Sequence, residues 1–166
     1  EKGGIFTRVA SSHLRIGTAQ YFAARGDTDS LGVLVDYAVQ RHEPKAKNAF
    51  EFFQSVIKKQ ARLVAQWMGV GFIHGVMNTD NMSILGITFD YGPYAFMDAY
   101  QADYICNHSD HTGRYAYSKQ PNIGLWNLNC LAHALSDLLT VDQLREILTQ
   151  YETIFVNTYA DLMRAK

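Results

Sequence analysis

The chain has 166 residues, of which 48% are hydrophobic and 19% charged, and this composition predicts one globular domain with a buried core rather than a disordered chain. A formal net charge of −1 gives no overall basic field, and no apolar run approaches the roughly 18 residues that span a membrane. We therefore expect neither nucleic acid nor a membrane as a partner, and two cysteines without a CxxC spacing favour the reducing cytoplasm.

Two helices are predicted at the start of the chain. The first follows Ser11 or Ser12 as its N-cap and ends at Gly26. The second covers residues 31–42, LGVLVDYAVQRH, and stops before Pro44. Its candidate N-caps are Asp27, Asp29 and Ser30.

A third predicted helix has an apolar face about five turns long and ends at Gly69. After Gly71 the short runs VGFIHGV, SILGI and ITFDY predict small strands and tight loops. Residues 98–120 are expected to form a long ordered loop, followed by helices over 123–139 and from Thr140 onward. The predicted fold class is α+β and mostly helical. The apolar positions of the third helix are Phe50, Phe53, Ile57, Ala61, Val64 and Met68.

The stretch HGVMNTDN, residues 74–81, has the spacing of a protein-kinase catalytic loop. Kinases place an Asp two residues after the His and an Asn seven residues after it, for the acceptor hydroxyl and Mg²⁺ respectively. His74 and Asn81 keep this spacing, but Val76 stands where the Asp should be. The usual base is therefore missing, and His74 is better explained as a buried hydrogen-bonding residue than as a base.

The sequence Asp90-Tyr91-Gly92 matches the kinase Asp-Phe-Gly with one aromatic exchange. The preceding MSILGITF has the length of two short strands, and we expect a hairpin that brings Asn81 and Asp90 side by side. One amide oxygen and one carboxylate are ligands that Mg²⁺ accepts together with phosphate oxygens. The alternative is that NTDN is ordinary turn chemistry without a metal.

A second metal hypothesis concerns CNHSDH, which offers soft and borderline ligands within six residues. Their spacings of two, two and one are too tight for all four to reach one tetrahedral ion. We therefore favour an ordered loop beside the active site over a zinc site. The four side chains are Cys106, His108, Asp110 and His111.

Four motifs in this order resemble the selenoprotein O family, the SelO/YdiU group: TRVASSHLRIG, HGVMNTDNMSILGITFDYGPYAFMD, ICNHSDHTGRYAYSKQP and IGLWNLNCLAHAL. The likeness covers nearly the whole chain. It implies a protein-kinase-like fold that lacks the usual catalytic Asp and binds ATP in a flipped orientation. It also implies transfer of AMP, rather than the γ-phosphoryl group, to hydroxyl side chains of protein substrates.

Carried over residue by residue, the resemblance implies roles for five side chains. Asp80 is the catalytic base, and Asn81 and Asp90 are the ligands of Mg²⁺, with Mn²⁺ as the alternative cation. Arg8 and Arg15 match basic residues that hold the phosphates of ATP. Without the resemblance, both arginines would be interpreted as ordinary surface residues.

The resemblance also describes the whole protein. No Gly-rich loop, strand lysine or partner acid precedes Arg8, so residues 1–166 are expected to be a single domain, the C-terminal-lobe-like fragment of a larger protein without its N-terminal lobe. We expect the parent to be a Mg²⁺-dependent protein adenylyltransferase for Ser, Thr and Tyr hydroxyls, in the cytoplasm or, for eukaryotic relatives, in mitochondria. The fragment alone is expected to be weak or inactive. The alternative is a non-catalytic nucleotide-binding pseudokinase scaffold, in which Val76 marks lost chemistry.

Overall fold

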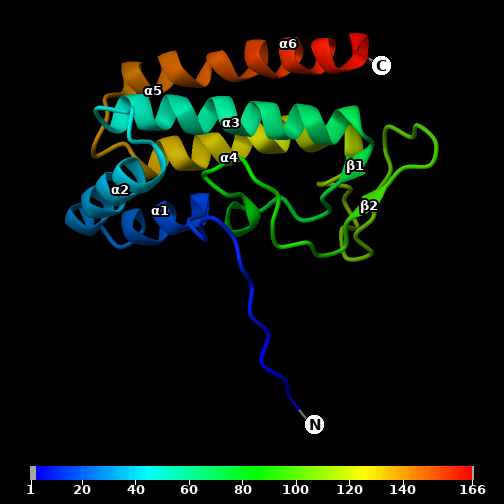
Figure 1. Ribbon diagram of the computed structural model, residues 1–166, viewed down its shortest axis with the longest axis horizontal. Coiled ribbons are helices and arrows are strands. Elements are labelled where there is room, and N and C mark those ends of the chain that lie inside the picture. The colour runs from blue at the N-terminus through cyan, green and yellow to red at the C-terminus, as the bar shows by residue number, and fades with distance from the viewer. Residues whose placement is uncertain (1–2, 166) are drawn as a thin grey trace.

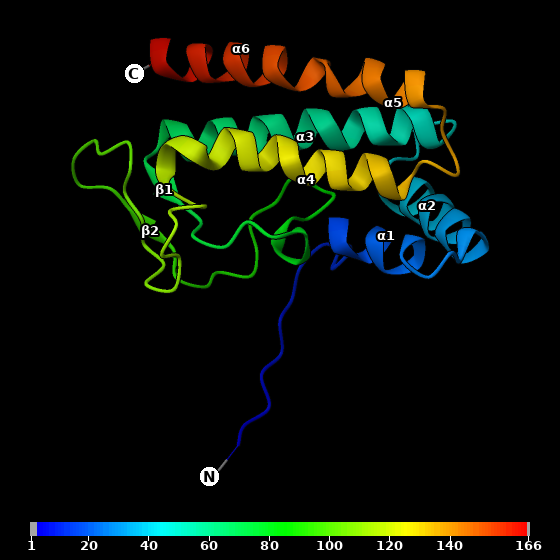
Figure 2. The same ribbon diagram turned by 180° about the vertical axis from the view of Figure 1, so that it is seen from behind.

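The computed structural model describes residues 3–165 and is mostly helical. Helix α6 (Gln150–Arg164) lies along α3 (Ala49–Gly69), and α4 (Gln120–Ala134) also packs against α3, below it in this view (Figure 1). Seen from behind, α1 (Ile16–Ala23) and α2 (Thr28–His42) lie toward one end of these three helices, and the short strands β1 (Phe72–Ile73) and β2 (Ala95–Phe96) lie toward the other (Figure 2). Residues 3–10 extend away from the helices (Figures 1 and 2).

Helix α1 begins later than the sequence predicts. Its N-cap is Arg15, so the assignment of Ser11 or Ser12 as the N-cap is wrong. The cause is a pairing between distant segments: residues 14–16 lie antiparallel to residues 82–84, joined by backbone hydrogen bonds of 3.0 and 3.2 Å. Leu14 and Arg15 are therefore held in the paired segment and cannot belong to the helix.

The predictions for the next two helices are confirmed. Asp27, one of the three candidate N-caps, accepts the Ser30 N–H at 3.0 Å and caps α2. Helix α3 begins after Asn48, whose side chain accepts the Glu51 N–H at 2.9 Å, and it ends at Gly69 as predicted. Four positions of its predicted apolar face are buried: Phe53, Ile57, Ala61 and Val64.

The predicted hairpin after Asn81 is wrong. Strand β1 (Phe72–Ile73) pairs antiparallel with β2 (Ala95–Phe96), and Phe72 lies opposite Phe96. The residues that follow Asn81 are already hydrogen-bonded to the start of α1, so they cannot form a second strand pair. The α+β prediction is correct in that a small antiparallel sheet is present. Its two strands lie just before and just after residues 74–94, whereas the prediction placed both strands inside that stretch.

The C-terminal helices differ from the prediction mainly at their ends. Helix α4, expected from residue 123, already begins at Gln120. Thr140 caps α5 (Val141–Leu148) through a reciprocal capping box, as its position predicts. The long final helix that was expected is interrupted at Thr149, where α6 starts as a separate helix.

One hydrophobic core joins the helices, because each of α1 to α6 contributes buried side chains to it. Two short 3₁₀-helices, η1 (Thr79–Asn81) and η2 (Tyr117–Lys119), lie in the irregular part of the chain. Among the described residues, no helix combines the length and the apolar character that crossing a membrane requires.

Candidate active site

The loop over residues 74–81 follows β1 and is fixed by amide side chains of α4. Gln120, at the start of α4, accepts the His74 N–H at 2.9 Å. Asn127, farther along the same helix, donates to the Met77 carbonyl at 2.8 Å. Both amides are fully buried. Because buried backbone groups require hydrogen-bond partners, these two side chains fix the path of the loop.

His74 is a buried packing residue. Its imidazole packs against the rings of Trp67 and Phe72, with centroids 5.3 and 6.3 Å away. Burial lowers the pKa of His74, although hydrogen bonding to the backbone of Phe89 opposes this effect. The imidazole is therefore neutral at pH 7, and its burial agrees with the scaffold role predicted for it.

Asp80 and Asn81 lie together in η1, at the end of the loop. The Asn81 Nδ2 donates to the Val76 carbonyl at 2.9 Å. The other end of this amide, the Oδ1 atom, is therefore directed away from Val76. Asp80 is exposed, and its carboxylate lies against Gly17 in the first turn of α1.

Asp90 is the point on which the two predicted phosphate-binding arginines converge. Arg15 donates to its Oδ2 atom from Nη2 at 2.8 Å and from Nε at 3.2 Å, and Arg8 forms an ion pair with its Oδ1 atom. The Asp90 side chain is 11% exposed, whereas that of Arg8 is 46% exposed. Asp90 also has a φ of 59°, a left-handed conformation that few non-glycine residues adopt and that surrounding contacts must hold in place.

The segment that leads to Asp90 is anchored on α3. The Trp67 Nε1 donates to Thr88 Oγ1 at 2.8 Å. Gly86, with a φ of 63°, approaches α3 so closely that a Cβ atom would lie 2.8 Å from the Lys59 carbonyl oxygen. Only glycine fits this combination of conformation and contact, so the approach of the segment to α3 is fixed on both sides of residue 87.

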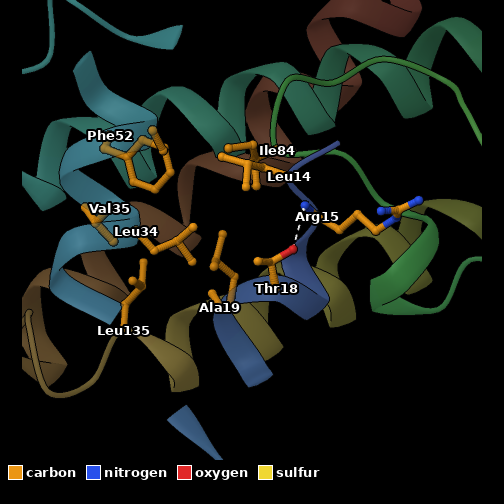
Figure 3. Close-up of a pocket in the computed structure, with 11 residues that line it drawn as sticks. Leu14, Arg15, Thr18, Ala19, Leu34, Val35, Phe52, Ile84 and Leu135 are labelled. Atoms are coloured by element: carbon orange, nitrogen blue, oxygen red, sulfur yellow. Dashed lines mark hydrogen bonds between the residues drawn. The ribbon is translucent and has the colours of Figure 1, made fainter. Parts of the chain in front are cut away.

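Arg15 lies between the core and the polar site. Figure 3 shows its guanidinium pointing away from a small apolar pocket of about 20 Å³ that the first four helices enclose. A separate open groove of about 530 Å³ lies between residues 6–10 and 87–91, and both Arg8 and Asp90 line it. This volume is within the usual range for small-molecule sites.

The five predicted site residues fall into two neighbouring groups. Arg8, Arg15 and Asp90 are in direct contact, and Asp80 and Asn81 are adjacent in η1. The pairing of residues 14–16 with residues 82–84, rather than the expected hairpin, connects the two groups. Arg15 belongs to one of the paired segments, and Asn81 immediately precedes the other.

The predicted cation ligands are of the right chemical kind. A carboxylate from Asp90 and an amide oxygen from Asn81 are hard donors that suit Mg²⁺. Within residues 3–165, no three His, Cys, Asp or Glu side chains gather closely enough to hold a metal ion. Mg²⁺ commonly uses one or two protein oxygens and completes its shell with phosphate oxygens and water, so this sparse donor set fits it.

The Cys106–His111 loop is ordered by one of its own carboxylates. Asp110 accepts the N–H groups of Arg114 at 2.9 Å and Tyr115 at 2.7 Å. Partial burial would raise the pKa of Asp110, but these backbone hydrogen bonds outweigh it and lower the pKa. The Asp110 carboxylate therefore stabilises the turn over residues 111–115 by accepting its backbone hydrogen bonds.

Sequence reasoning missed three residues that shape the site: Gly17, Gln120 and Asn127. Two of them are amides on the inner side of α4, and a buried amide within an apolar helix is a recognisable signal. Gly17 is a glycine in the first turn of a helix, where alanine has the higher intrinsic propensity. Their hydrogen-bond partners and contacts are distant in sequence, so pattern reading alone does not identify what they touch.

Comparison with known proteins indicates first the class of protein. Three curated bacterial relatives are named protein nucleotidyltransferase YdiU: that of Pectobacterium atrosepticum is 52% identical over 170 residues, that of Yersinia pestis 51% over 170 residues, and that of Aeromonas hydrophila 50% over 166 residues. Each match covers 100% of this chain but 35% of the relative. The chain thus spans about a third of the length of these proteins.

The family follows from a match along the entire chain. The family model described as "Protein adenylyltransferase SelO" matches residues 1–166. The chain belongs to this family, which confirms the resemblance carried by its four motifs.

Proposed function

We propose that this chain carries the nucleotide- and cation-binding part of a protein adenylyltransferase, built as a kinase-like C-terminal lobe. The whole protein would transfer AMP from ATP, bound in the flipped orientation, to Ser, Thr or Tyr hydroxyls of protein substrates. Mg²⁺, or alternatively Mn²⁺, would be the cation. One observation carries the proposal: in a chain that matches the SelO family from end to end, Arg8 and Arg15 converge on Asp90.

Each of the five side chains has a chemical task in this proposal. Arg8 and Arg15 bind phosphate oxygens, because guanidinium groups match their geometry and charge. Asn81 and Asp90 would hold the cation, which supplies charge neutralisation at the phosphates when it is bound. Asp80 orients the acceptor hydroxyl and takes its proton while the hydroxyl oxygen attacks the α-phosphorus and the bond from that phosphorus to pyrophosphate breaks.

The ion pairs at Asp90 imply that nucleotide and cation bind cooperatively. The two guanidinium groups occupy the carboxylate that a cation requires, and the carboxylate neutralises the arginines that phosphates require. A nucleotide or a cation that binds alone must therefore break the ion pairs without any compensation. When both bind, the nucleotide takes the arginines and leaves Asp90 to the cation, and the cation takes Asp90 and leaves the arginines to the nucleotide. The coupling is positive, and linkage makes it reciprocal.

Val76 favours one alternative. It stands where a kinase base would be, and its carbonyl is hydrogen-bonded to Asn81. A protein that had lost its chemistry at this position would bind nucleotide in the groove without transferring any part of it. This scaffold reading uses the same arginines but gives Asp80 no role.

Label transfer separates the two functions. The full-length protein is incubated with candidate protein substrates, Mg²⁺ and ATP labelled at either the α- or the γ-phosphate. We expect protein labelling from α-labelled ATP alone, lowered by about 100-fold or more in Asp80→Asn and unchanged in the control Asp36→Asn, which alters an exposed carboxylate of α2. Residues 1–166 alone are expected to transfer weakly or not at all. Transfer of γ-label, or of neither label, overturns the proposal, and nucleotide binding without transfer supports the scaffold.

A further inference from the structure

Gly17 and Asp80 lie so close together that no residue with a side chain fits at position 17 while Asp80 keeps its place. A Cβ atom built on Gly17 would lie 2.1 Å from Asp80 Oδ1 and 3.1 Å from its Cγ. Heavy atoms that are not bonded to each other cannot be this close. The carboxylate of Asp80 therefore occupies the space that any other side chain at position 17 would fill.

Backbone conformation does not explain the glycine. Gly17 is absent from the described glycines with positive φ, and it lies in the first turn of α1, where alanine is intrinsically favoured by up to about 1 kcal/mol. Gly32, inside α2, is a useful contrast because a Cβ atom there would meet nothing within 4 Å. Space for Asp80 is thus the feature that distinguishes Gly17.

The two residues cannot separate to make room. Gly17 directly follows the paired segment 14–16, and Asp80 precedes its partner segment 82–84 by two residues. The hydrogen bonds from Ile16 N–H to the Met82 carbonyl and from Ile84 N–H to the Leu14 carbonyl, 3.0 and 3.2 Å long, hold the two backbones together. A methyl group at position 17 would therefore be accommodated by rotation of the Asp80 side chain, which is exposed and free to turn outward.

We infer that Gly17 is a positioning residue for Asp80: it leaves open the single place in which this carboxylate can lie beside the first turn of α1. The inference rests on the proposed function, in which Asp80 orients the acceptor hydroxyl. Gly17 touches no reacting atom and acts only through the location of the Asp80 carboxylate. Loss of the glycine displaces the carboxylate without altering Arg8, Arg15 or Asp90.

The test compares four variants of the full-length protein: Gly17→Ala, Gly32→Ala, Asp80→Asn and the double variant of Gly17→Ala with Asp80→Asn. Misplacement of a catalytic group by about 1 Å can reduce a rate by 100-fold, so we expect Gly17→Ala to lower kcat for AMP transfer by about that factor with the KM for ATP unchanged. Gly32→Ala makes the same exchange in a helix without the contact, and it should retain full kcat.

The double variant distinguishes positioning from a general defect. If Gly17 acts through Asp80, adding Gly17→Ala to Asp80→Asn lowers kcat no further, because the displaced carboxylate is already gone. A further fall in the double variant, or full kcat in Gly17→Ala, overturns the inference while leaving the proposed function intact. Full kcat in Asp80→Asn instead removes the role of Asp80 on which the inference rests. Thermal unfolding of the same full-length variants, followed by circular dichroism, should show Gly17→Ala and Gly32→Ala to be at least as stable as the unaltered protein.

Discussion

Asp90 shows how much of the site depends on single side chains. It combines a left-handed backbone conformation, a nearly buried carboxylate and two arginine partners that come from the chain before α1. Arg8 lies in an exposed extended segment, so its link to the folded part of the molecule includes this ion pair. Changes at Asp90 should therefore alter ligand binding more than they alter the core.

Replacing Asp90 by Asn should strengthen the binding of ATP in the absence of any divalent cation. The change frees Arg8 and Arg15 from a competing negative charge, and partly exposed ion pairs of this kind are worth about 0.5–1 kcal/mol each. We expect roughly a tenfold gain in affinity by titration calorimetry in EDTA, together with loss of the gain that Mg²⁺ gives the unaltered protein. Asp161→Asn, which removes the exposed Arg164 pair of α6, is the matched control. Unchanged or weaker metal-free binding in Asp90→Asn contradicts the exchange of partners.

His74 should make the fold sensitive to mild acid. Because burial lowers its pKa, the unfolded chain takes up a proton near pH 6.5 that the folded chain does not. The part of the unfolding free energy that depends on neutral His74 is therefore fully present above pH 6.5. The unfolding free energy falls as the pH decreases below this value, by up to about 1.4 kcal/mol per pH unit. Urea unfolding across this range should give a shallower acid slope in His74→Gln than in the unaltered chain. His42, whose pKa is also lowered by burial, accounts for a remaining slope; an unchanged slope in His74→Gln would contradict the prediction.

At the scale of elements, α4 is the support on which the site loop rests. Its inner face presents amides where an apolar side chain would be expected, and these amides bind backbone groups of the loop. The helix therefore determines the conformation of a segment that has little regular structure of its own.

Asn127 and Asn129 form a matched pair for testing this support. Each donates to the carbonyl four residues earlier in α4, at 2.9 Å, but Asn127 alone of the two also donates to the Met77 carbonyl of the loop. Asn127→Ala leaves this buried carbonyl without its donor, and we expect a loss of about 1–3 kcal/mol of unfolding free energy. Asn129→Ala, at an exposed site, should cost less than about 1 kcal/mol. Equal losses, measured by urea denaturation, would show that the contact with the loop contributes nothing.

Elements whose signals are local could be predicted from the sequence, and those that depend on distant pairing could not. The Asp27 cap, the extent of α3 and the Thr140 capping box each follow from residues within one turn. The hairpin failed because residues 82–84 pair with residues 14–16, and no local pattern reveals that partner. For the same reason the spacing of His74, Asn81 and Asp90 indicated a kinase-like loop, whereas Arg8 and Arg15 could be chosen only by resemblance to a family.

At the scale of the whole molecule, the chain forms one core although it spans about a third of the length of its relatives. We expect residues 1–166 to unfold in a single cooperative transition, as domains of this size usually do. A Trp126→Phe variant leaves Trp67, buried in α3, as the one tryptophan, so its fluorescence reports on the centre of the core while circular dichroism reports on all helices. Coincident denaturation curves support a single domain, and separated curves would contradict it.

The antiparallel pairing of residues 14–16 with residues 82–84 also has a consequence for motion. Two hydrogen bonds tie the start of α1 to the turn that carries Asp80 and Asn81. A displacement of α1 within the molecule therefore carries Arg15 and the η1 turn with it as one rigid unit. Thermal fluctuations can change the distance from this unit to the exposed segment that bears Arg8, a segment that no backbone pairing within residues 3–165 holds to α1, but they leave the separation between Arg15 and Asp80 nearly constant. Of the two arginines, Arg15 is thus the one that the backbone pairing keeps at a nearly constant distance from Asp80.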